Sequence, residues 1–91
     1  MSDFDAILAD LRKKFRGKLE VRATELENHV GADNTDEIRA LVHRISGTAG
    51  SYGFAEISDA ATRLDLAFKQ GAVPSSFRDD LAALISLMRA A

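Results

Sequence analysis

Apolar residues recur every three or four positions along most of the chain, which is the spacing of one face of an α-helix. They fall into four stripes separated by short polar segments. The apolar positions are Phe4, Ile7, Leu8, Leu11, Phe15, Leu19, Leu26 and Val30; Ile38, Leu41, Val42, Ile45, Ala49 and Tyr52; Phe54, Ile57, Ala61, Leu64 and Phe68; and Phe77, Leu81, Leu84, Ile85 and Met88. With one proline and no strand-like alternation, this pattern predicts an all-α domain.

The residues between the stripes set the expected ends of the first two helices. Gly31 is suited to the C′ position after the first helix, where glycine adopts the left-handed conformation without strain. Asn34 or Thr35 is expected to cap the second helix, and acidic residues follow in its first turn. This second helix is expected over residues 35–51, with Gly53 as its stop.

The third and fourth helices follow the same logic. The third is expected over residues 54–70 and is ended by Gly71, and Pro74 begins the fourth. Gly17 is expected to bend or divide the first helix, because glycine within a helix costs about 1 kcal/mol relative to alanine. Short connections place consecutive helices antiparallel, so residues 1–91 are predicted to form one up-down-up-down four-helix bundle.

One histidine of the second helix does not follow the apolar stripe. At about 100° per residue, His43 points away from the apolar face of that helix. Its neighbours one turn behind or ahead are Arg39, Ser46, Gly47 and Gly50. The sequence therefore predicts an imidazole in solvent, flanked by small residues, that another protein can approach closely.

Composition narrows the classes of function. The 91 residues include no cysteine, and no spacing of carboxylates completes a metal site with His43 or with His29, which we expect to be structural or exposed. The net charge is −2, and the basic residues are interspersed with acidic ones and form no basic stripe, which disfavours nucleic-acid binding. The apolar stretch 81–87 is too short to span a bilayer, and the acidic start is unlike a secretory signal. We expect a cytoplasmic monomer that contacts neither nucleic acid nor membrane.

The residues around His43 also form a motif. The pattern His-x-Ile-x-Gly-x-Ala-Gly-Ser-x-Gly, over His43, Ile45, Gly47, residues 49–51 and Gly53, resembles the phosphorylation-site helix of histidine-containing phosphotransfer domains. The resemblance implies a phosphoryl carrier rather than an enzyme, with His43 as phosphoacceptor. It also implies partners, namely a receiver domain of a response regulator and a histidine kinase or hybrid kinase. No cofactor is expected on this chain, because Mg²⁺ would come with the receiver.

Transfer of a phosphoryl group requires one imidazole nitrogen to be free, and an acceptor that holds Nδ1–H leaves Nε2 as the nucleophile. Because the turn between the second and third helices is centred near Gly53 and Phe54, residues 63–65 are expected level with His43. Asp65 lies there at the edge of the core face, and it is similar to the acidic or amide residue that often holds the histidine in the family. The alternative is a solvated Asp65 paired with Lys69 one turn on.

The chain departs from the family pattern at Ser46. The family usually has a lysine three residues after the histidine, where its ammonium lies beside the phosphoryl group, and a serine brings no charge. Arg39 is the expected substitute, since it lies about 20° around the helix from Ser46. Ser46 itself can still donate a hydrogen bond to the phosphoryl group.

A docking face is expected around the histidine. Two exposed helical glycines cost stability, which is explained if a receiver closes over the imidazole there; the alternative is that the helix frays after Ser46. The expected partner-binding residues are Arg44, Gly47, Gly50, Tyr52 and Phe54. Two other functions remain open. One is an adaptor that docks a receiver or kinase through the same face without phosphorylation, and the other is a purely structural helical module.

Overall fold

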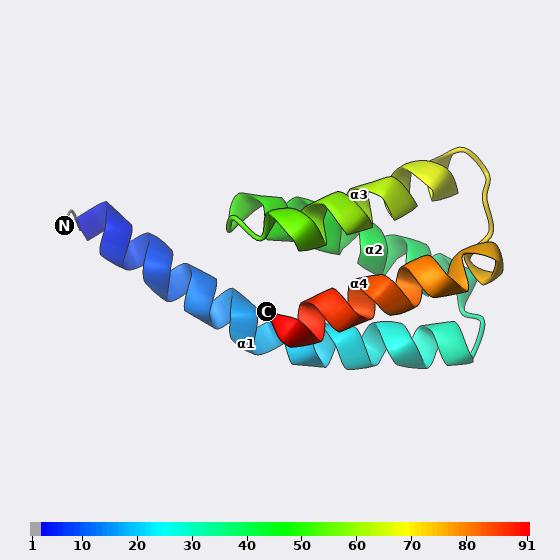
Figure 1. The fold of residues 1–91 in the computed structure, drawn as a ribbon, viewed down its shortest axis with the longest axis horizontal. Coiled ribbons are helices and arrows are strands. Elements are labelled where there is room, and N and C mark those ends of the chain that lie inside the picture. The colour runs from blue at the N-terminus through cyan, green and yellow to red at the C-terminus, as the bar shows by residue number, and fades with distance from the viewer. Residues whose placement is uncertain (1–2) are drawn as a thin grey trace.

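The computed structural model describes residues 3–91, and these form four α-helices and a short 3₁₀ turn (Figure 1). The elements are α1 (Asp3–Gly31), α2 (Thr35–Ser51), α3 (Ala55–Lys69), η1 (Pro74–Phe77) and α4 (Arg78–Ala90). Consecutive helices run antiparallel, up-down-up-down, and the described residues contain no strand. The predicted all-α four-helix bundle is therefore confirmed.

Most helix ends lie where turn chemistry predicts them. The bounds of α2 match the expected range, and Gly53 and Gly71 follow α2 and α3 with φ of 80° and 97°, a conformation that favours glycine. Pro74 starts a 3₁₀ turn, and the α-helical bonding of α4 begins only at Arg78. The last helix therefore begins later than the position of the proline predicts.

The turn after α1 differs from the prediction. Gly31 is the last residue of α1, and the left-handed residue is Asp33, with φ of 53°. Asn34 occupies the N-cap position of α2, yet its side chain makes no capping hydrogen bond. Its Nδ2 lies 3.1 Å from Nδ1 of His29 instead, so these two side chains join the end of α1 to the start of α2.

The first helix is bent but not divided. Figure 1 shows its blue N-terminal half extending away from the other helices, at an angle to the cyan half that packs in the bundle. Phe4 and Ile7 are 70% and 59% exposed, so the apolar stripe of α1 continues beyond the core at these turns. The reason is length, because a helix of 29 residues rises about 44 Å and a partner of 17 residues only about 26 Å.

The core is built from all four α-helices and consists of apolar side chains. The largest fully buried ones are Phe68, Leu19, Leu26, Ile38, Leu81, Leu84, Met88 and Val42. Among residues 3–91 no polar or charged side chain is buried. Nor does any helix in that range combine the length and hydropathy that a membrane span requires. The chemistry of this fold therefore lies on its surface.

Candidate functional site

His43 projects from α2 beside the neighbouring helix α3. Its side chain is 65% exposed, and its Nδ1 lies 3.1 Å from Oδ2 of Asp65 on α3, whose side chain is only 14% exposed. The two residues are 22 positions apart, and the turn between α2 and α3 brings them level. The structure thus joins an exposed imidazole to a largely covered carboxylate.

The contact defines which nitrogen of His43 carries the proton. Partial burial raises the pKa of Asp65, but hydrogen bonds from His43 and Lys69, together with the charge of Lys69, outweigh this and hold that pKa below its usual value. At neutral pH the carboxylate is therefore ionised and can only accept a hydrogen bond. Nδ1 of a neutral His43 must then be the donor, so Nε2 keeps its lone pair.

A lysine completes this cluster. Nζ of Lys69 lies 3.0 Å from Oδ2 of Asp65, the same oxygen that accepts the hydrogen bond from His43. The sequence presents His43 and Lys69 as alternative partners of Asp65, but in the structure both are present. The spacing of four residues places Lys69 and Asp65 on one face of α3, so this ion pair could be anticipated from the sequence.

The hydroxyl of Ser46 does not point freely into this cluster. Its Oγ donates a hydrogen bond of 2.7 Å to the backbone carbonyl of His43, one turn earlier in α2. The backbone carbonyl of Ser46 accepts a hydrogen bond of 3.1 Å from Ser58 on α3. The Ser46 hydroxyl therefore donates its hydrogen bond to the helix backbone and not to the cluster of His43, Asp65 and Lys69.

Arg39 is held at the end of α3. Its Nη2 donates a hydrogen bond of 3.0 Å to the backbone carbonyl of Phe68. Carbonyl groups in the last turn of a helix carry partial negative charge, so a guanidinium is well placed there. This contact gives Arg39 a structural partner that the sequence does not suggest.

The two glycines that follow His43 have different surroundings. A Cβ on Gly47 would meet no other side chain within 4 Å, so this position is open to solvent. A Cβ on Gly50 would lie 3.0 Å from Oγ of Ser58, so part of the reason for glycine there is the close approach of α3. Because α2 continues to Ser51, the alternative that it frays after Ser46 is wrong.

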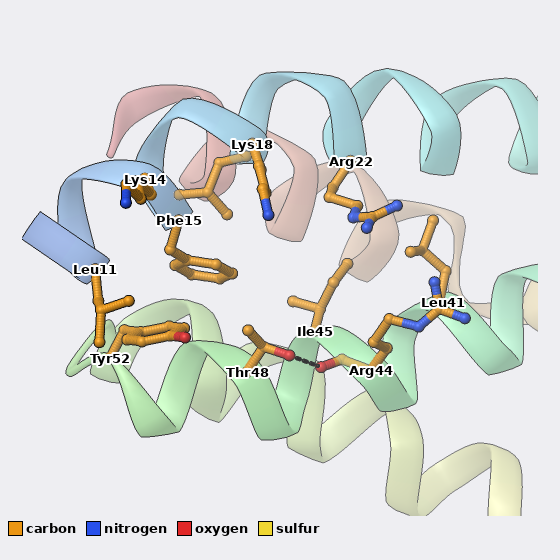
Figure 2. A pocket seen from close by; sticks show the side chains of 11 residues that line it. Leu11, Lys14, Phe15, Lys18, Arg22, Leu41, Arg44, Ile45, Thr48 and Tyr52 are labelled. Carbon is orange, nitrogen blue, oxygen red and sulfur yellow. Dashed lines mark hydrogen bonds between the residues drawn. The ribbon is translucent and has the colours of Figure 1, made fainter.

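The expected docking residues do not all share a face with His43. The rings of Tyr52 and Phe54 lie 5.2 Å and 5.3 Å from that of Phe15 and so pack toward α1. Tyr52 and Arg44 line a groove of about 220 Å³ between α1 and α2, where Figure 2 shows them facing α1. His43 is not part of the lining of this groove. Gly47 remains beside the histidine, whereas Tyr52 lies on another side of α2.

Comparison with protein families gives one decisive match, since the family model described as "Hpt domain" matches residues 10–91. The chain belongs to the Hpt domain family. The match covers α2, α3, η1 and α4 completely and most of α1. No curated protein and no solved structure matches the chain.

Membership of the Hpt family implies histidine phosphotransfer in a phosphorelay with two-component partners. Hpt domains carry phosphoryl groups and are not catalysts. Within residues 3–91 of this Hpt domain, no group of three or more His, Cys, Asp or Glu side chains could hold a metal ion.

Proposed function

We propose that this Hpt domain carries a phosphoryl group on Nε2 of His43. It receives the group from a histidine kinase or from the aspartyl phosphate of a receiver domain, and passes it to another receiver. The observation that carries this proposal is the hydrogen bond from Nδ1 to Asp65, which leaves Nε2 unprotonated on a side chain that is 65% exposed.

The chemistry follows from this arrangement. The Nε2 lone pair attacks the phosphorus, the bond from phosphorus to the donor's aspartate oxygen breaks, and the bonding electrons leave with that carboxylate. The imidazole gains positive charge as the N–P bond forms, and the Asp65 carboxylate stabilises this charge through Nδ1–H. The transition state is loose, so positioning and nearby positive charge matter most, and Mg²⁺ belongs to the receiver.

The surface around His43 suits the approach of a receiver. The open position at Gly47 leaves room beside the exposed imidazole. In this proposal the domain works in the cytoplasm. It works there as a monomer, because one chain supplies all four helices that the fold needs.

The experiment is transfer of labelled phosphate from phosphorylated receiver domains of the same organism. The His43→Gln variant is the test, and His29→Gln is the matched control, since His29 also hydrogen-bonds a neighbouring side chain through Nδ1. We expect an acid-labile, base-stable label on the wild type and on His29→Gln, and none on His43→Gln. Label that persists on His43→Gln contradicts the proposal. Binding of a receiver without any label would instead support a phosphorylation-independent adaptor.

A further inference from the structure

Ser46 occupies the position of α2 where the resemblance implies a lysine, so this position carries no positive charge. A phosphoryl group on Nε2 of His43 would carry negative charge across the imidazole ring from the ionised Asp65, which lies at Nδ1. Like charges separated by one ring repel each other, and the repulsion opposes loading of the histidine. The site therefore needs a positive charge from another part of the fold.

We propose that Lys69 on α3 supplies this charge and donates a hydrogen bond to the phosphoryl group carried by His43. The inference rests on the proposed function and deepens it by assigning a second phosphoryl-site residue.

The geometry of the Asp65 carboxylate carries the inference. Nδ1 of His43 and Nζ of Lys69 lie 3.1 Å and 3.0 Å from the same oxygen, so the imidazole and the ammonium are at most about 6 Å apart. The Lys69 ammonium neutralises the carboxylate in the unloaded state. Its compact charge and flexible four-carbon stem let the ammonium swing from Asp65 toward the phosphoryl group on Nε2 once that group is present.

The mobility of Lys69 also fits this role. Its side chain is 60% exposed, and ion pairs between exposed groups are weak, so little opposes a reorientation toward a new anion. The nearby cation on α2, Arg39, is held by the carbonyl of Phe68. Lys69 is thus the cation that the structure joins to the His43–Asp65 pair.

The test uses two substitutions and a matched control. Lys69→Gln removes the charge and Lys69→Arg keeps it. Lys14→Gln is the matched control. Lys14 is also exposed, with 68% of its side chain accessible, and its Nζ lies 3.1 Å from Oδ2 of Asp10, four residues earlier in the helix. Phosphoramidate serves as a small donor that needs no partner, and a phosphorylated receiver serves as the second donor.

We expect Lys69→Gln to slow labelling of His43 by both donors about tenfold, the effect of losing one charge-assisted hydrogen bond at the reacting group. Lys69→Arg and Lys14→Gln should label at nearly the wild-type rate. Addition of Ser46→Lys to Lys69→Gln should restore much of the loss, which a merely structural role of Lys69 would not explain. Melting temperatures of all variants establish that they are folded.

The outcomes separate this inference from the proposed function. Labelling of Lys69→Gln at the wild-type rate overturns the role of Lys69 and leaves His43 as the carrier. A loss seen with the receiver but not with phosphoramidate also overturns it, because Lys69 would then act in docking. If phosphoramidate labels His43 and no receiver or kinase exchanges the label, the relay function fails while the effect of Lys69 on the histidine is still measured.

Discussion

Replacement of Asp65 by alanine should change the tautomer of His43. In the wild type the acceptor at 3.1 Å holds the proton on Nδ1, and the 14% exposure of Asp65 protects this bond from competition by water. Hydrogen bonds to charged groups contribute about 1.5–3 kcal/mol, but the imidazole is exposed, so we take about 1 kcal/mol here. That energy corresponds to about a fivefold change in the ratio of the two tautomers.

Nitrogen-15 NMR of the imidazole measures this ratio directly at a pH where the ring is neutral. We expect an unprotonated Nε2 in the wild type and a protonated Nε2 in a substantial fraction of Asp65→Ala. The rate of phosphorylation by phosphoramidate should fall in proportion to the fraction of molecules with a free Nε2, and so by less than the change in the tautomer ratio, because only that form reacts. Identical nitrogen shifts in the two proteins would refute the reasoning, as would a wild type whose Nε2 carries the proton.

Three further predictions concern stability. Gly47→Ala should raise the free energy of unfolding by up to about 1 kcal/mol in denaturant titrations, whereas Gly50→Ala should gain less, since its Cβ would lie 3.0 Å from a hydroxyl on α3. Leu84→Ala should cost about 2–5 kcal/mol and Ile7→Ala less than about 0.5 kcal/mol, because only Leu84 is buried, and equal costs would contradict the exposed placement of Ile7. The folded-state pKa of Asp65 lies below its usual 3.8, so its ionised form stabilises the fold above that pH; melting temperature should fall as pH decreases below about 4, and less so in Asp65→Asn.

The sequence predicts the helices well because the burial of one helical face repeats a local pattern. Glycines that must adopt positive φ, such as Gly53 and Gly71, mark two of the ends. The outward direction of His43 follows from the same periodicity, and symmetry of the α2–α3 hairpin places Asp65 opposite. These features depend only on the spacing of residues along the chain, which can be read directly from the sequence.

Other features depend on what each segment meets. The stripe at Phe4 and Ile7 has helical spacing, but periodicity does not reveal that α1 extends beyond its partner helices. Spacing of four residues allows a pair between Asp65 and Lys69, yet it cannot show that one carboxylate oxygen accepts hydrogen bonds from both Lys69 and His43. Tyr52 lies half a turn around α2 from His43, so its packing toward α1 could have been predicted from the helical angle.

The wholly apolar core has a consequence for signalling. In the proposed function, loading and unloading of His43 would change charge only at the surface of the α2–α3 hairpin, and among the described residues no polar side chain is buried that would have to rearrange in response. The folded state should therefore keep one shape through the whole cycle. The signal would pass to the next protein only as the phosphoryl group transferred on contact, with no allosteric transition in this domain.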